Sequence, residues 1–158
     1  MDEVNFGSER ILAGLIISDA CLTSSLLFCS EVWTPLSLID INKLEKIDNK
    51  FKRKLMKAQA KTPIISFHLE LGTLKLRHLI LLRRLLYFHC IVTKDENDLT
   101  KKILYKQLAD TTNGDFIEQI KNDHEYLGLK FNLSELKDTS KDFFKSKIKK
   151  IIKKVAFN

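Results

Sequence analysis

The segment from residue 73 to residue 93 constrains the fold more than any other part of this sequence. Large apolar side chains stand at positions around nearly the whole circumference of a helix drawn through it. A helix that is apolar nearly all round has no face for water, so we predict that it is the buried centre of a helical bundle. The cations of this segment, together with Lys94 directly after it, have no acidic residue among them: Lys75, Arg77, Arg83, Arg84 and Lys94.

The rest of the chain also has the pattern of helices. Apolar residues recur at helical spacing, and no stretch of four or more residues alternates as a half-buried strand does. The chain has 158 residues with 44% hydrophobic composition, and its 5 Gly and 2 Pro are few for a turn-rich β fold. We therefore predict an all-α fold, with a helical bundle over residues 1–94 and a C-terminal helical segment over 95–158, packed on it or following it.

Capping residues mark the predicted helix ends. We expect helices over about 8–29, 35–58, 73–93 and 140–156, a short one before Gly72, one after residues 95–98 and one between Asp115 and Gly128. The expected caps are Ser8, Thr34-Pro35, Thr62-Pro63, the turn Asn113-Gly114-Asp115, and Thr139 with Asp142 as a capping box; Gly72 and Gly128 are the expected left-handed ends.

Charge is concentrated in two basic blocks around an acidic one. Lys+Arg number 27 and Asp+Glu 20, which gives a net charge of +7. Residues 43–61 hold eight cations and two acids, and residues 139–158 hold seven cations and one acid, whereas residues 95–138 are net acidic. This pattern places a mild boundary near Asp95 and favours an anionic partner.

No catalytic or cofactor motif stands out. The glycines are isolated, so a phosphate-binding glycine loop is absent, and the four histidines have no metal-binding spacing. The odd number of cysteines contains no CxxC pair, and we expect Cys21, Cys29 and Cys90 to be small buried apolar residues. The sequence predicts no enzyme activity, no cofactor and no metal site.

The basic helices carry the remaining signal. A dense cationic patch within residues 50–57 is typical of nucleic-acid contact through phosphates, and its alternative is a solvated face of a basic protein. Arg83 and Arg84 lie in an apolar helix, so they lie at its rim or meet phosphate or carboxylate. The last helix is amphipathic with a basic face, which is compatible with packing on the bundle, with lying on an anionic membrane or with binding a partner. Of these three, we expect packing on the bundle.

A membrane span is not expected. Residues 11–29 are apolar enough to consider, but Asp19 lies in the middle of them, and a charge at the centre of a span is costly. The acidic start of the chain is unlike a secretory signal. We expect an intracellular protein, nuclear or cytoplasmic.

Several motifs in order resemble the region that follows the polymerase core in non-LTR (LINE-type) retrotransposon reverse transcriptases. They are Leu26-Leu27-Phe28-Cys29-Ser30-Glu31-Val32-Trp33, the run from Leu44 to Leu55 with Phe51 and Arg53, Leu69-Glu70-Leu71-Gly72, and Leu82-Arg83-Arg84-Leu85. The resemblance covers about residues 10–158. One departure is Phe28-Cys29, where the family usually has Tyr-Gly.

The resemblance implies a helical thumb, which grips a template–primer duplex with basic helices. Carried over by position, Glu31 and Trp33 close the first thumb helix, Arg53 is the arginine of the second, Glu70 and Gly72 form the turn, and Arg83 and Arg84 lie on the arginine-bearing helix. The palm carboxylates precede this region in the family. The resemblance therefore implies a fragment or remnant without polymerase activity.

Together these observations predict a non-catalytic nucleic-acid-binding module that contacts an RNA–DNA hybrid or duplex through phosphates. The predicted contacts are Lys50, Lys52, Arg53, Lys54, Lys57, Arg77, Arg83 and Arg84. The alternative is a protein–protein interaction or structural remnant that self-associates through exposed apolar helices.

Overall fold

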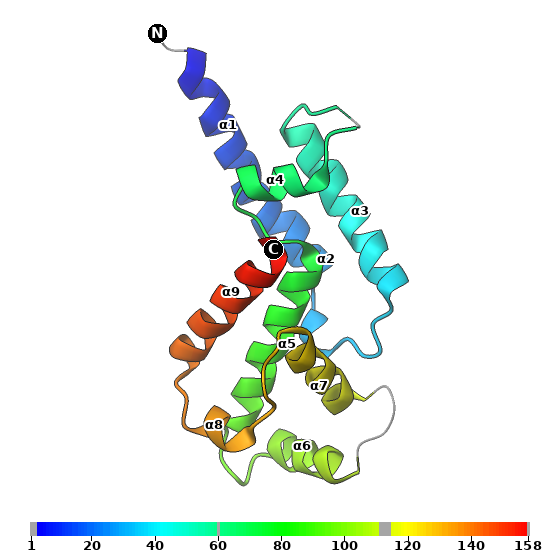
Figure 1. The fold of residues 1–158 in the computed structure, drawn as a ribbon, viewed down its shortest axis with the longest axis vertical. Helices are drawn as coiled ribbons and strands as arrows, with labels where there is room; N and C mark the ends of the chain where they lie inside the picture. The colour runs from blue at the N-terminus through cyan, green and yellow to red at the C-terminus, as the bar shows by residue number, and fades with distance from the viewer. Residues whose placement is uncertain (1–2, 60, 111–114, 158) are drawn as a thin grey trace. The chain divides into compact units, whose positions relative to one another are not determined.

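The computed structural model describes residues 3–59, 61–110 and 115–157, with side chains from residue 9 onward. All regular structure in these ranges is helical and no strand occurs in them, which confirms the all-α prediction (Figure 1). The elements are α1 (Glu3–Ile17), a π-helical stretch (Ser18–Thr23), α2 (Ser24–Leu26), a 3₁₀ turn (Ser30–Val32), α3 (Leu38–Leu55), α4 (Ile64–Glu70), α5 (Leu76–Val92), α6 (Leu99–Ala109), α7 (Phe116–Tyr126), α8 (Leu133–Lys137) and α9 (Lys141–Phe157).

The chain divides into two units, which we describe separately. Unit 1 comprises Met1–Phe28 and Ser37–Arg77, and unit 2 comprises Cys29–Leu36 and His78–Asn158. The boundary that the charge pattern suggested near Asp95 therefore falls inside unit 2. This is because the apolar residues of α5 from His78 onward are covered by helices that come later in the chain.

The first helical region of unit 1 is interrupted, contrary to the single helix expected over about 8–29. α1 begins at Glu3, so Ser8 is not its N-cap, and the helix widens to the π form at Ser18. In that stretch the Ser24 hydroxyl donates to the Asp19 carbonyl five residues earlier, at 2.9 Å. Polar side chains that hydrogen-bond to the helix backbone favour such local distortions.

α3 is shorter at both ends than the predicted range of 35–58. Its N-cap is Ser37, whose hydroxyl accepts from the Asp40 backbone N–H at 3.2 Å. At its other end Lys57 has a φ of 49°, and the N–H groups of Lys57 and Ala58 donate to the carbonyls of Lys54 and Arg53. This is the Schellman arrangement, with lysine at the position that glycine normally takes.

The short helix α4 ends as predicted. Gly72 has a φ of 61°, and the Thr73 N–H donates to the His68 carbonyl at 3.0 Å. Phe67 on α4 is buried. At Gly14, α1 lies against the Leu55 side chain of α3, which would have to move to admit a Cβ there.

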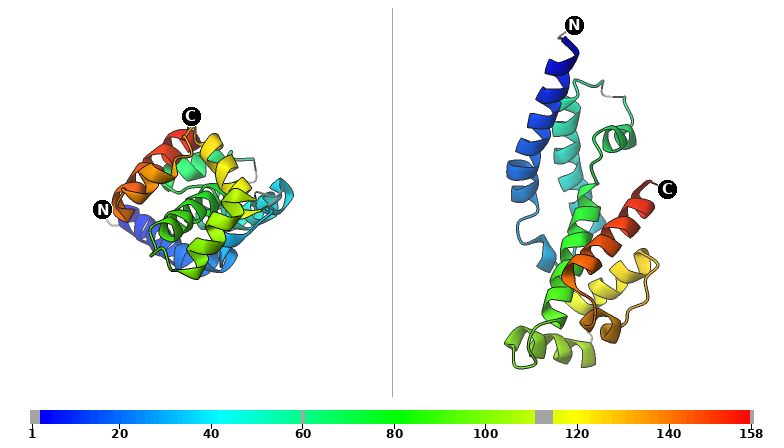
Figure 2. Two further views of the ribbon diagram at one scale, coloured as in Figure 1. Left: turned by 90° about the horizontal axis from the view of Figure 1, so that it is seen from below. Right: turned by 90° about the vertical axis from the view of Figure 1, so that its left-hand side faces the viewer.

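Unit 2 is built around α5. Its residues Ile80, Leu85, Phe88 and Val92 are almost completely buried, which confirms the predicted central helix. Aromatic contacts join it to its neighbours: Tyr87 packs on Phe116 of α7 at 6.0 Å, and His89 stacks on Phe144 of α9 at 4.6 Å between ring centroids. Figure 2 shows α7 and α9 beside α5.

Side-chain caps begin the later helices of unit 2. Asp115 accepts from the Glu118 N–H and Gly128 ends α7 with a φ of 65°, both as predicted. Asp98 accepts from the Thr100 N–H and caps α6, which begins after residues 95–98 as expected. α8, capped by Asn132, was not predicted. Before α9 the Ser140 hydroxyl accepts from the Phe143 N–H, so Thr139 does not cap this helix. The predicted turn residues Asn113 and Gly114 lie outside the described residues.

Candidate nucleic-acid interface

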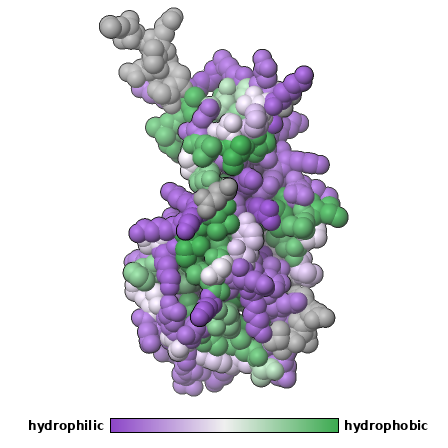
Figure 3. Space-filling view, viewed as in Figure 1, coloured by the Kyte–Doolittle hydropathy of each residue, from purple (hydrophilic) through white to green (hydrophobic). Residues whose placement is uncertain are grey.

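Three exposed lysines on the outer side of α3 form the basis of the candidate interface. Lys46, Lys50 and Lys54 are spaced four residues apart, which places them on one side of the helix over a length of about 12 Å. Within the described part of the chain, no carboxylate pairs with any of them. We call these three residues the α3 lysine stripe. In Figure 3, hydrophilic residues follow α3, and exposed apolar ones, Leu38 and Ile39, gather at its N-terminal end.

Lys43, one turn before the stripe, is neutralised locally. Its ammonium lies 3.2 Å from the Asp40 carboxylate, and both side chains are exposed. The Ser37 hydroxyl donates to Asp40, and this bond, with Lys43, holds the pKa of the Asp40 carboxyl below its usual range. The positive surface therefore begins at Lys46.

Arg53 and Lys57 extend the positive surface at the C-terminal end of α3. The Arg53 guanidinium donates to the Gln59 carbonyl at 2.9 Å and lies over the Phe67 ring, 5.3 Å from its centroid. These contacts orient it and leave further N–H donors for a phosphate. Lys57 is exposed beyond the helix end.

Lys52 does not belong to this interface, which corrects its prediction as a phosphate contact. It lies on the inner side of α3, where its ammonium is 2.5 Å from the Asp48 carboxylate, with only 6% and 2% of the two side chains exposed. A buried charge is retained only when it is paired. His68 is buried nearby, and its desolvation together with the charge of Lys52 lowers the pKa of its imidazole to about 4.

Arg84 is also removed from the predicted contacts. It lies inside unit 2, where it donates to both carboxylate oxygens of Asp123 at 3.2 and 2.9 Å and to the Trp33 carbonyl at 3.4 Å. Of the three environments predicted for it, the rim of the helix, phosphate or carboxylate, the structure shows carboxylate. Burial raises the pKa of the Asp123 carboxyl, and the Arg84 guanidinium opposes that effect.

The two remaining predicted contacts, Arg77 and Arg83, are not part of the stripe. The backbone N–H of Arg77 donates to the Glu45 carboxylate at 3.3 Å, and Glu45 is on a different side of α3 from Lys50. Arg83 is half-buried in unit 2, where it lines an open hollow with Lys141 and Lys145 of α9. The contacts that unit 1 brings together are therefore Lys50, Arg53, Lys54 and Lys57. Lys46 was missed, although its four-residue spacing from Lys50 was visible in the sequence.

The last helix packs on α5 within unit 2, in line with the default expectation of packing. Phe144, Ile148 and Ile152 of α9 are buried, and its lysines point outward. One of them, Lys147, pairs with Glu135 at 2.9 Å. None of the helices in the described ranges is both long and apolar enough to cross a membrane.

The described residues include no group of three or more His, Cys, Asp or Glu side chains that could hold a metal ion. The expectation for the cysteines was wrong. Cys21 and Cys29 are exposed and Cys90 is half-buried, because the first falls in the π-helical stretch and the second in the turn after α2.

Comparison with family models, curated proteins and solved structures finds no match to this chain. The relationship to the retrotransposon reverse transcriptases therefore stays a prediction from the motifs.

Proposed function

We propose that this chain binds nucleic acid through the α3 lysine stripe, with contacts to phosphates rather than to bases. The observation that carries the proposal is the alignment of Lys46, Lys50 and Lys54 on one exposed side of a helix without a carboxylate partner among the described residues. Like charges four residues apart destabilise a helix, by about 0.2–0.5 kcal/mol for each pair. A bound polyanion would relieve this repulsion.

The chemistry of the stripe fits a phosphate backbone better than a compact anion. Lysine ammonium groups act as adjustable point charges, and Arg53 adds a planar donor at one end. A row of charges along about 12 Å follows a linear polyanion, whereas one small anion would engage only one or two of them. We expect RNA–DNA hybrids and duplexes to bind alike, because no base-reading element is involved.

The reverse-transcriptase resemblance supports this proposal at one position. The family usually has Gly where this chain has Cys29, and Cys29 adopts a φ of 54°, in the left-handed region that favours glycine. We therefore propose that the chain is a thumb-like module related to those enzymes and that it has no polymerase activity of its own.

Salt dependence gives a quantitative test. Four phosphate contacts, from the stripe and Arg53, correspond to a slope of log K against log salt of about −3.6, or a loss of affinity of roughly 150-fold between 50 and 200 mM salt. Fluorescence anisotropy of a labelled RNA–DNA hybrid, titrated with the full chain over a salt series, measures this slope.

A charge-matched pair of variants separates the stripe from general basicity. Lys50→Glu/Lys54→Glu changes two stripe residues, and Lys149→Glu/Lys153→Glu makes the same change at the same spacing on the exposed side of α9. We expect the first variant to lower the magnitude of the slope by about 2 and to bind at least roughly tenfold more weakly than the second at low salt. Equal losses in the two variants, or no binding by the wild-type chain, would contradict the proposal. Circular dichroism checks that both variants fold.

Self-association is the second candidate function. Leu12 and Ile16 lie four residues apart on α1, and each is about 60% exposed. Light scattering over a concentration series, with Leu12→Lys/Ile16→Lys as the comparison, tests it. A wild-type monomer at every concentration would refute this candidate.

A further inference from the structure

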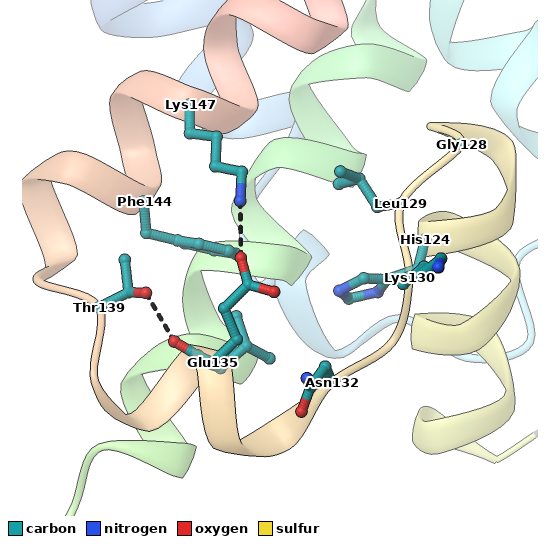
Figure 4. Close-up of a pocket in the computed structure, with 10 residues that line it drawn as sticks. His124, Gly128, Leu129, Lys130, Asn132, Glu135, Thr139, Phe144 and Lys147 are labelled. Carbon is teal, nitrogen blue, oxygen red and sulfur yellow. Dashed lines mark hydrogen bonds and ion pairs between the residues drawn. The ribbon is translucent and has the colours of Figure 1, made fainter.

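A cavity in unit 2 lies between the end of α7, the loop that follows Gly128, α8 and α9. Its volume is about 240 Å³, small for a ligand site but sufficient for a molecule with one ring. Figure 4 shows the side chains around it, with His124 directed inward from one side and Phe144 from the other. None of its residues belongs to the α3 lysine stripe.

The first distinctive feature of the cavity is an unpartnered nitrogen on His124. The side chain is only 3% exposed, and its Nδ1 lies 2.8 Å from the Ile120 carbonyl. A carbonyl only accepts, so Nδ1 carries the hydrogen and, in the neutral ring, Nε2 is a bare acceptor. No described residue supplies a donor to Nε2. Nε2 is therefore an acceptor that remains available to a ligand or a water molecule in the cavity.

The ring of His124 is held in place by aromatic neighbours. Phe88 and Phe131 meet it edge to face, at 6.3 and 5.3 Å between centroids. Together with the bond to Ile120, these contacts fix the direction of Nε2. A fixed acceptor selects for a ligand with a donor at the matching place.

The walls of the cavity are apolar. Leu129, Leu136 and Phe144 line it, and the Phe144 ring is immobilised by its stack on His89. A flat apolar body would be covered by these three side chains.

The lining of the cavity carries a net positive charge. Lys147 pairs with Glu135 at 2.9 Å, and Lys130 is exposed without a described carboxylate partner. Two cations against one acid favour an anionic group on the ligand.

We infer that this cavity binds a small aromatic acid that carries a hydrogen-bond donor. The donor, a hydroxyl or ring N–H, binds Nε2 of His124. The ring packs between Leu129, Leu136 and Phe144, and the acidic group meets Lys130 and Lys147. A metal ion is a poorer fit, because His124 and Glu135 are the only strong ligands in the lining.

The test uses two probes that differ in one group, 4-hydroxybenzoate and benzoate, titrated into the full wild-type chain and followed by backbone amide NMR. We expect 4-hydroxybenzoate to bind with a millimolar dissociation constant, as one ring allows, and to shift amides of residues 124–147. Benzoate lacks the donor and should bind about 3- to 10-fold more weakly.

Three variants assign the contacts. His124→Asn keeps a donor near the position of Nδ1 and removes Nε2, so it should abolish the difference between the two probes. Lys147→Gln should weaken both probes, and Lys150→Gln, an exposed change on the same helix outside the cavity, should weaken neither. Equal affinity of the wild-type chain for the two probes, absence of binding, or shifts confined to other regions would overturn the inference, even if His124→Asn fails to fold. Nucleic-acid binding through α3 is independent of these outcomes.

Discussion

Replacement of Arg84 by methionine tests whether the buried ion pair holds α5 to α7 within unit 2. Arg84 donates to both oxygens of Asp123, and at most 9% of either side chain is exposed. Methionine fills much of the same space without charge, so among the described residues Asp123 keeps only the Gln119 side-chain amide as a donor, at 3.3 Å. Loss of one partner from a buried pair costs about 3–5 kcal/mol.

The free energy of protonating Asp123 sets an upper limit on how much of that loss can come from the unpaired carboxylate. An unfolded carboxyl group with a pKa near 3.9 is protonated at a cost of about 4 kcal/mol at pH 7 and about 1.5 kcal/mol at pH 5. Burial already raises the pKa of Asp123 against the opposing charge of Arg84, and removal of Arg84 raises it further. The folded variant then binds more protons than the unfolded chain, so its deficit in stability shrinks as the pH falls.

Urea unfolding, followed by circular dichroism and by the fluorescence of Trp33, the only tryptophan, measures the effect. We expect Arg84→Met to lose about 3–5 kcal/mol at pH 7 and clearly less at pH 5. The double variant Arg84→Met/Asp123→Leu, which leaves no buried charge at this site, should recover most of the loss. A loss below about 1 kcal/mol at pH 7, or a loss that is independent of pH, would refute the reasoning that the two charges are shielded from water and that each needs the other as its partner.

Three further predictions concern stability. The pKa of His68 is about 4 in the folded chain and 6.5 in the unfolded chain, so the free energy of unfolding should fall by at most about 3 kcal/mol as the pH is lowered from 6.5 to 4. In urea titrations, His68→Leu should not show this contribution to the loss of stability. Cys29→Gly should raise the unfolding free energy by about 1 kcal/mol, since its φ is 54°; no gain would show that the turn is unstrained. Gly72→Ala, at a φ of 61° with open space around it, should lower the melting temperature through about 1 kcal/mol of backbone cost alone; an unchanged value would contradict this.

Helix ends could be predicted where glycine marks them. Gly72 and Gly128 both have the expected left-handed conformation. The end of α3 uses the same hydrogen bonds but places Lys57 in that conformation, so the sequence offered no glycine signal and the predicted end was three residues too late. Secondary-structure type followed from periodicity, whereas this boundary depended on a residue that adopts an unfavoured conformation.

The cysteines show a different limit of sequence reasoning. A buried role was expected from residue type, but Cys21 and Cys29 are exposed because of local breaks in the first helical region. A hydrogen bond from the Ser24 hydroxyl to the Asp19 carbonyl accompanies the first of these breaks. The spacing of apolar residues alone does not reveal them.

The lysines of α3 show which part of the candidate interface could already be predicted from the sequence. Lys52 has Asp48 four residues before it, the spacing at which opposite charges meet on a helix, and the two pair on the inner side. Lys46, Lys50 and Lys54 have no acidic residue three or four positions away on either side. The residues three and four positions away along the helix therefore distinguish the lysine that is paired within the chain from the lysines that are available to a partner. The same test fails for Arg84, because its carboxylate is 39 residues away and only the tertiary fold brings the two together.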